Sequence, residues 1–195
     1  MSVKEVSLPV WCICFVALSA CHHVQATAPT ESTQNVTETQ KQTSYHPTTL
    51  GLTHGRYYNE TILIGEQPTD AQFQAAAAEG FRTVVNLRTP KEQEHAEQPR
   101  VEAFGMNYIA LPINGADGIT RQNAQTLATA IAAAEKPILL HCSSGQRAAA
   151  LLTLVAHYTE GKDIDSAIAA GRSIGLSKLE PRVREVLETT AMQSK

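Results

Sequence analysis

Residues 136–150 read K-P-I-L-L-H-C-S-S-G-Q-R-A-A-A, and the pattern of the domain is clearest there. The apolar run at 138–140 has the length and character of a buried strand. Small residues follow at 143–145, and a helical pattern begins at Gln146. A strand, a small-residue loop and a helix in this order aim several backbone N–H groups and the positive end of a helix dipole at one point. This stretch therefore predicts an anion site at a strand-to-helix junction.

Two side chains in this loop add chemistry to the anion site. Cys142 faces the field of the loop and the helix, which favours the thiolate over the thiol and makes the sulfur nucleophilic. Arg147 can bind two oxygens of a tetrahedral oxyanion through its planar guanidinium group. The residues expected to complete the anion-binding loop are Ser143, Ser144, Gly145 and Gln146. The alternative is an inert core cysteine beside a surface arginine, and the combined pattern disfavours it.

The first twenty residues are predicted to be a signal peptide. Lys4 precedes an apolar stretch at 8–20, which is shorter than the roughly 20 apolar residues that a membrane-spanning helix needs. The stretch ends in L-S-A-C at 18–21, which resembles a bacterial lipobox and implies that Cys21 is lipidated. His22 follows instead of Asp, and by resemblance to Gram-negative lipoproteins this favours the periplasmic face of the outer membrane. A signal peptide cleaved nearby, without lipid, is the alternative.

Residues 21–49 are expected to form a disordered tether, because a segment rich in Thr, Gln, Glu and Ser cannot bury enough surface to offset its ordering entropy. Residues 50–195 are long enough for one folded domain, and the membrane contact is expected through the N-terminal lipid only. The formal charge of -3 gives no reason to expect nucleic acid as a partner. The histidines show no metal-ligand spacing, and no cofactor motif occurs, so neither a metal nor a cofactor is predicted.

Cysteine usage strengthens the case for Cys142. Of the four cysteines, Cys12 and Cys14 leave with the signal peptide and Cys21 carries the lipid. Cys142 is then a single thiol in an oxidising compartment, where structural cysteines normally pair. An unpaired thiol there favours a chemical role.

Strands and helices alternate through the domain. Strands are predicted at 61–64, 83–87, 107–111 and 138–140, and helices at 70–79, 91–104 with an interruption at Pro99, 121–134, 146–160, 163–173 and 181–190. This order predicts an α/β fold with a central parallel sheet flanked by helices. The site should lie at the carboxyl ends of the strands, where Arg88, the loop 112–120 and Cys142 fall.

Several other polar residues have two readings. Arg88 either helps to hold the anion or pairs with a nearby carboxylate. His141 should point away from the face that Cys142 occupies, where it can orient the loop through hydrogen bonds. Glu92, Glu94 and Glu97 are expected on the solvated face of the helix at 91–104.

Three motifs resemble the beta-lactamase hydrolase-like phosphatase family, which is similar to dual-specificity and tyrosine phosphatases. They are G-x-Q-P-T at 65–69, G-F-R-T-V-V-N-L-R at 80–88 and H-C-x-x-G-x-R at 141–147, and the similarity covers about residues 58–187. The resemblance implies a cysteine-phosphatase-like three-layer domain that hydrolyses phosphate monoesters through a phosphocysteine intermediate. Cys142 would be the nucleophile and Arg147, Arg88 and the loop the phosphate ligands, acting on a phosphorylated small molecule or a phosphoprotein.

Related phosphatases protonate the leaving group from an aspartate on a mobile loop ahead of the nucleophile strand. The resemblance assigns this role to Asp117, which is the only carboxylate between Phe104 and Glu135. Two glycines near it would let the loop close over a substrate. The alternative is that Asp117 is a turn residue chosen for local backbone hydrogen bonds.

The loop departs from the usual tyrosine-phosphatase pattern in two places. Four residues rather than five separate Cys142 from Arg147, and Ala148 follows where Ser or Thr is usual. A loop of this length also occurs in rhodanese-type sulfurtransferases, in which Cys142 would carry a persulfide taken from a sulfur donor. Against that reading, the chain lacks a G-H-I-x-G-A stretch and has N-L-R at 86–88 where D-x-R would be typical. A third reading is an inactive module that binds an anion or a phosphopeptide without turnover.

Overall fold

The computed structural model of the chain describes residues 49–193. The predicted signal peptide, the predicted lipidation residue Cys21 and the tether up to residue 48 lie outside the described residues. Within the described part, no helix has the length and apolar character needed to cross a membrane. Residues 49–193 also contain no group of three or more His, Cys, Asp or Glu side chains placed to hold a metal ion.

Five strands form one sheet within residues 49–193, in the order β1-β2-β5-β3-β4. In chain order the elements are β1 (Arg56–Asn59), β2 (Ile62–Gly65), α1 (Asp70–Ala78), β3 (Thr83–Asn86), the 3-10 turn η1 (Pro90–Glu92), α2 (Gln98–Ala103), β4 (Asn107–Ala110), α3 (Arg121–Ala133), β5 (Ile138–His141), α4 (Gln146–Tyr158), α5 (Ile164–Ser173) and α6 (Glu180–Gln193). Strands β2, β5, β3 and β4 run parallel, which confirms the predicted α/β class with its central parallel sheet.

The first strand, β1, is not among the strands that the sequence predicts. β1 pairs antiparallel with β2 at the edge, and its side chains are half exposed or exposed. The tight connection is closed by Asn59, whose Oδ1 accepts from the backbone N–H of Thr61 at 3.0 Å. A short, half-exposed edge strand carries no buried apolar run, so sequence periodicity did not reveal it.

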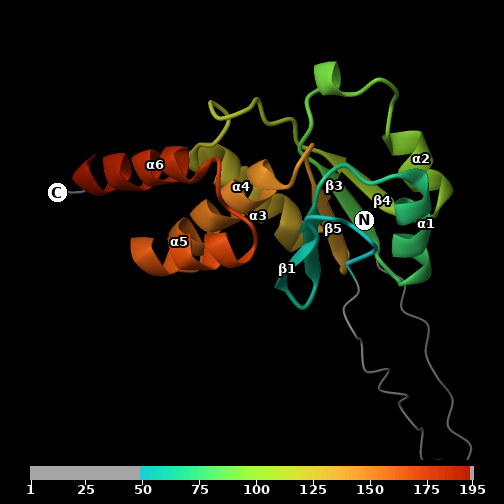
Figure 1. The fold of residues 1–195 in the computed structure, drawn as a ribbon, viewed down its shortest axis with the longest axis horizontal. Helices are drawn as coiled ribbons and strands as arrows, with labels where there is room; N and C mark the ends of the chain where they lie inside the picture. The colour runs from blue at the N-terminus through green and yellow to red at the C-terminus, as the bar shows by residue number, and fades with distance from the viewer. Residues whose placement is uncertain (1–48, 194–195) are drawn as a thin grey trace, which may run out of the picture. The chain divides into compact units, whose positions relative to one another are not determined.

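The sheet separates two hydrophobic cores and so forms the middle of three layers (Figure 1). Alternate residues of β5 face opposite sides, because side chains in a strand alternate. Ile138, Leu140 and the following Cys142 pack in the larger core with α3, α4, α5 and α6. Leu139 packs in the smaller core with α1 and α2. The predicted three-layer arrangement is therefore present.

Helix α1 follows its sequence signals closely. Thr69 and Gln72 form a capping box at its start, and Gly80 follows its end with a φ of +86°. The helix predicted at 91–104 is wrong, since only η1 and the short α2 are helical there. Pro99 lies in the first turn of α2 rather than interrupting a longer helix, because a residue without an N–H fits the first turn without losing a hydrogen bond.

Candidate active site

The loop after β5 lies at the centre of the sheet. The register of β5 with its neighbours places the ends of β2, β5 and β3 together, at Gly65, His141 and Asn86. Gly145 has a φ of +81°, and a Cβ built on it would lie 3.5 Å from the carbonyl group of Gly65. Glycine satisfies both the left-handed backbone and the close approach of these two chain segments.

Cys142 lies beneath the surface of this loop, with 1% of its area exposed. The backbone N–H of Gly145 donates a hydrogen bond to its Sγ atom at 3.1 Å. Helix α4 begins immediately afterwards, and its N-cap, Gly145, provides no side-chain cap. The first N–H groups of a helix have no acceptor within the helix, so this helix end directs unpaired donors and positive potential toward the loop. These features favour a bound anion at this end of the helix.

Arg147 is almost fully buried, and its guanidinium group is held from several sides. Its Nη1 donates to the carbonyl groups of Ile113 at 2.7 Å and Leu87 at 3.3 Å, and its Nη2 donates to Ser143 Oγ at 3.0 Å. Burial disfavours its charge, but the hydrogen bond from Arg147 to Glu92 and the nearby Cys142 sulfur outweigh this and raise the pKa of Arg147. Arg147 therefore remains a fixed cation beside the nucleophile candidate.

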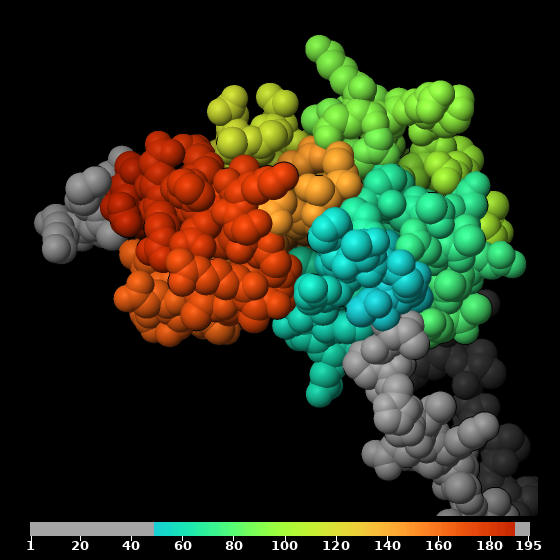
Figure 2. All heavy atoms as spheres, viewed as in Figure 1, coloured from blue at the N-terminus to red at the C-terminus, as the bar shows by residue number. Residues whose placement is uncertain are grey.

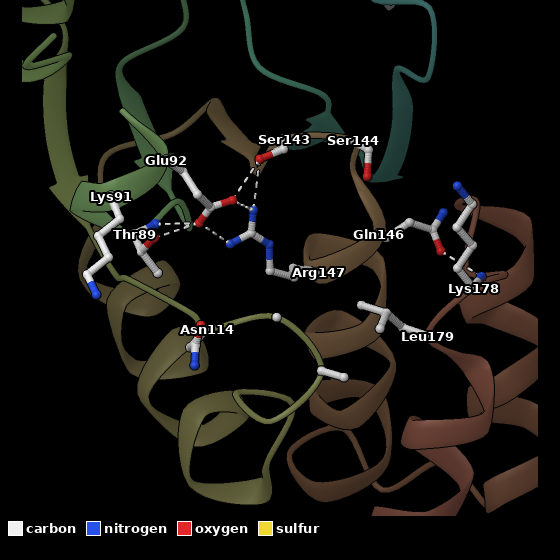
Figure 3. Close-up of a pocket in the computed structure, with 12 residues that line it drawn as sticks. Thr89, Lys91, Glu92, Asn114, Ser143, Ser144, Gln146, Arg147, Lys178 and Leu179 are labelled. Carbon is white, nitrogen blue, oxygen red and sulfur yellow. Dashed lines mark hydrogen bonds and ion pairs between the residues drawn. The ribbon is translucent and has the colours of Figure 1, made fainter. Parts of the chain in front are cut away.

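Glu92 contradicts its predicted position on a solvated helix face. It accepts bidentate hydrogen bonds from Arg147, at 2.8 Å to Nη1 and 2.6 Å to Nη2, and a third from Ser143 Oγ at 2.9 Å (Figure 3). The hydrogen bond from Arg147 holds the pKa of Glu92 far below its usual range, with smaller contributions from Thr89 and Ser143 against the effect of burial. Glu92 is therefore ionised at neutral pH and cannot serve there as a proton donor.

Glu97 also differs from its predicted position on a solvated helix face, because it is buried behind the loop. Its Oε1 lies 2.8 Å from Nε2 of His141, and its Oε2 accepts from the side chain of Gln67. Arg88 donates to the other end of that glutamine side chain. Burial disfavours the charge of Glu97, but the hydrogen bond and charge of His141, the Gln67 contact and the charge of Arg88 lower its pKa overall.

His141 occupies the face that the sequence predicted for it. It packs edge-on against Phe73 of α1, whereas Cys142 packs in the core on the other side of the sheet. Its Nδ1 atom lies 3.4 Å from the carbonyl oxygen of Cys142. Buried contacts thus link Glu97, through His141, to the loop at residues 142–145, which is called the nucleophile loop below.

A pocket of about 550 Å³ opens above the loop. The loop at residues 112–120, before α3, is called the arch below. Figure 2 shows the surface of the loop after β5 (orange) between the segment after β3 (green) and the arch (yellow). The lining residues are Thr89, Lys91, Glu92, Asn114, Gly115, Ala116, Ser143, Ser144, Gln146, Arg147, Lys178 and Leu179. Cys142 and Gly145 lie just beneath this lining.

Beyond Cys142 and Gly145, which lie beneath the lining, two more of the predicted site residues do not line the pocket. Arg88 does not line it and instead contacts Gln67 on the side of the buried Glu97. Asp117 is exposed on the arch between the buried residues Ile113 and Ile119, and it does not line the pocket either. In this structure the arch presents its earlier residues, including Asn114, to the pocket.

Several residues that shape the site were missed in the sequence. Glu92 had a usable signal, because T-P-K-E at 89–92 is a capping-box pattern and its carboxylate does accept from the backbone N–H of Thr89 at 2.8 Å. Lys178 had none, since it reaches the pocket from the α5–α6 connection, 31 residues beyond Arg147 in the chain. Asn114 likewise carried no spacing signal.

Comparison with known proteins matches residues 56–158 to the family model of the beta-lactamase hydrolase-like protein, phosphatase-like domain. Beta-lactamase hydrolase-like proteins of Xylella fastidiosa strain Temecula1 and of Agrobacterium fabrum are 36% and 33% identical to this chain over 101 residues. The match covers 49% of this chain and 23% of each relative, so the chain spans less than a quarter of the length of these curated relatives.

Solved structures share the fold at lower identity. A phosphatase-titled structure from Neisseria meningitidis is 24% identical with a TM-score of 0.57, covering 67% of this chain and 94% of that chain. P. aeruginosa TpbA is 16% identical with a TM-score of 0.58, covering 70% of this chain and 84% of that chain. A second TpbA structure, in complex with pTyr, is 15% identical with a TM-score of 0.55 over 71% of this chain and 90% of that one. At these identities the similarity establishes the fold.

Proposed function

The chain belongs to the family of beta-lactamase hydrolase-like proteins with a phosphatase-like domain, and from this membership we propose that it is a cysteine-dependent phosphatase of phosphate monoesters. The predicted family is thereby confirmed, and the activity is the proposal. The observation that carries it is the hydrogen bond from Gly145 to the Cys142 sulfur, at the start of α4 and beside the Arg147 guanidinium. A sulfur in this field is suited to attack a bound oxyanion.

In the first step, the Cys142 thiolate attacks the phosphorus atom of the ester. A P–S bond forms, the P–O bond to the alcohol breaks, and the departing alkoxide takes a proton. In the second step, water attacks the phosphocysteine, the P–S bond breaks, and inorganic phosphate and the thiolate are regenerated. Neither step needs an oxidant, a reductant or a cofactor.

Arg147 is proposed to bind the phosphoryl oxygens while Glu92 positions it. Glu92, Ser143 and the two backbone carbonyl groups accept from the Nη1 and Nη2 atoms of the guanidinium, and an incoming oxyanion would take the donor that Nη2 now gives to Ser143. The N–H groups of the loop and of the first turn of α4 would bind the remaining oxygens.

The proton for the leaving group is proposed to come from Asp117. Glu92 is the only carboxylate that lines the pocket in the described part of the chain, and it is held in its ionised form. Asp117 would reach the pocket only if the arch moved inward. Gly115, at a φ of +50°, is a position where the backbone of the arch can turn.

A sulfurtransferase remains the second candidate, because the four-residue interval between Cys142 and Arg147 is also the rhodanese spacing. In that reaction the thiolate takes a sulfur atom from thiosulfate, releases sulfite and passes the sulfur to a thiophilic acceptor such as cyanide. The inactive anion-binding module is the third candidate.

A paired assay separates the three candidates. The full-length chain is incubated with 4-nitrophenyl phosphate and, separately, with thiosulfate and cyanide. Release of nitrophenol that is lost in Cys142→Ser supports the phosphatase. Formation of thiocyanate alone supports the sulfurtransferase. If neither nitrophenol nor thiocyanate forms, the result supports the binding module.

We also propose that the chain is a lipoprotein at the periplasmic face of a bacterial outer membrane. This proposal rests on the L-S-A-C sequence at 18–21 and on the polar segment that follows it. It would place the phosphatase where small phosphate esters or phosphoproteins of the envelope are its substrates.

A further inference from the structure

The pocket over the nucleophile loop carries an excess of positive charge. Three cationic side chains line it, those of Lys91, Arg147 and Lys178, against the single carboxylate of Glu92, which leaves two net positive charges. The whole chain, in contrast, has a formal charge of -3. Glu92 is engaged with Arg147 through both of its oxygens. The two lysines are therefore the positive charges that remain for the rest of a ligand.

Lys178 is fixed to the nucleophile loop through Gln146. The backbone N–H groups of Lys178 and Ser177 donate to Oε1 of Gln146 at 2.9 and 3.1 Å. Nε2 of the same side chain donates to the carbonyl oxygen of Gly175 at 2.7 Å. The Gln146 side chain thus forms hydrogen bonds with three residues of the α5–α6 connection, Gly175, Ser177 and Lys178. These three hydrogen bonds, called the Gln146 clamp below, fix the backbone position of Lys178.

The ammonium group of Lys178 is available for a ligand. Its side chain is exposed, and among residues 49–193 no carboxylate forms an ion pair with it. The nearest acidic residue in the sequence, Glu180, is already paired with Arg172 and Arg184. Lys178 is therefore a free positive charge at the pocket wall.

The described residues that line the pocket include no aromatic side chain. Aromatic ligands gain affinity by stacking on rings. The pocket therefore offers no ring on which an aromatic ligand could stack.

We propose that this pocket takes a small, non-aromatic phosphate ester that carries a second anionic group, and that Lys178 binds this second group. The inference rests on the proposed phosphatase function and names the substrate class of the same site. Figure 3 shows Lys91 and Lys178 on opposite sides of Arg147. Lys178 is assigned because Gln146 ties it to the loop that holds the phosphoryl group.

The first test measures binding without turnover. Full-length Cys142→Ser chain is titrated calorimetrically with inorganic phosphate and with pyrophosphate. We expect pyrophosphate to bind about tenfold more tightly than inorganic phosphate, which is the difference that one charge-assisted hydrogen bond makes. Lys178→Met should remove this difference. Inorganic phosphate should be affected by less than about twofold, since a single phosphoryl group needs only the loop. Lys162→Met is the matched control, because that lysine pairs with Glu160 and does not line the pocket.

The second test uses two substrates that share the same ester and differ in one anionic group. For the full-length enzyme, kcat/KM should be about tenfold higher for 3-phosphoglycerate than for glycerol 3-phosphate, and Lys178→Met should equalise them through KM. Equal values in the unmodified enzyme, or equal effects of Lys178→Met and Lys162→Met, would overturn the second-anion site while leaving the phosphatase intact. A chain that binds neither phosphate nor pyrophosphate would contradict the anion site itself, and with it the proposed function.

Discussion

The carboxylate of Glu97 and the imidazole of His141 face each other at 2.8 Å, both buried, on the side of β5 opposite to Cys142. Their contact lies directly behind the nucleophile loop, because the other ring nitrogen of His141 approaches the Cys142 carbonyl oxygen. An ionised carboxylate at this depth persists only when hydrogen-bond donors surround it. Gln67 and His141 provide those donors.

We expect Glu97→Gln to lower the free energy of unfolding by about 2 kcal/mol at pH 7, since an amide cannot accept from both neighbours as a carboxylate does. The pKa of Glu97 is lowered in the folded state, so its stabilisation is complete above the unfolded value and is lost as pH falls below about 4.3. Urea denaturation at pH 7 and at pH 3 to 4 measures this. Glu94→Gln, an exposed neighbour, is the control. Equal losses for both variants would contradict a special role for the buried carboxylate.

Cys142→Ser should abolish hydrolysis and leave phosphate binding within about threefold, because a hydroxyl is a poor nucleophile at neutral pH while the loop that holds the anion is unchanged. The Gly145 N–H that now donates to sulfur would donate to oxygen. The measurements are steady-state kinetics and calorimetry with inorganic phosphate. Residual turnover close to that of the unmodified chain would exclude Cys142 as the nucleophile.

Arg147→Lys should reduce kcat/KM by at least about a hundredfold, because an ammonium group cannot reproduce the planar fork or the five hydrogen bonds that fix it. Leaving those buried acceptors without a donor should also lower the melting temperature. If Arg147→Lys leaves kcat/KM unchanged, Arg147 has a structural role only. Thermal unfolding and kinetics on the same preparation separate the two effects.

Asp117→Asn tests the proton donor. As a general acid on the arch, it should matter most for poor leaving groups, slowing alkyl phosphates by about 10²–10⁴ and sparing 4-nitrophenyl phosphate. The basic limb of the pH profile for alkyl substrates should flatten. Because Asp117 lies outside the pocket lining, the effect also requires the arch to move. Equal effects on every substrate, or none, would count against this role.

The lipid anchor is tested at Cys21, outside the described residues. Metabolic labelling with a radioactive fatty acid should mark the unmodified chain in a Gram-negative host, and Cys21→Ala should remain unlabelled. Labelled protein should fractionate with the outer membrane, as the residue after Cys21 suggests. A soluble periplasmic form of the unmodified chain would instead indicate a cleaved signal peptide without lipid.

The parts of the fold that the sequence predicts are those fixed by local chemistry. Buried apolar runs such as 138–140 can be predicted as strands without knowing which strands they pair with. Thr69 marks the start of helix α1 and Gly80 marks its end to within a few residues. The loop after β5 belongs to the same class, since its glycine, cysteine and arginine are neighbours in the chain. For this reason the strand, loop and helix at the centre were found without a structure.

The parts that escaped prediction depend on partners far away in the chain. Glu92, Glu94 and Glu97 look equivalent in the sequence. Glu92 is nevertheless paired with Arg147, 55 positions later, and Glu97 is buried against His141, 44 positions later. No periodicity distinguishes them, because the segment between η1 and α2 is not a regular helix. The third remains exposed, as expected of all three.

The clamp formed by Gln146 has a consequence for how such an enzyme can diversify. The family match ends at residue 158, but the wall that Lys178 and Leu179 contribute lies beyond it. The segment that would cleave the ester and the segment that would select it therefore lie in different parts of the chain. They share the larger hydrophobic core, and the Gln146 side chain links them by hydrogen bonds at the pocket. Exchanging the α5–α6 connection could redirect such an enzyme to a new ester while its reaction stays the same.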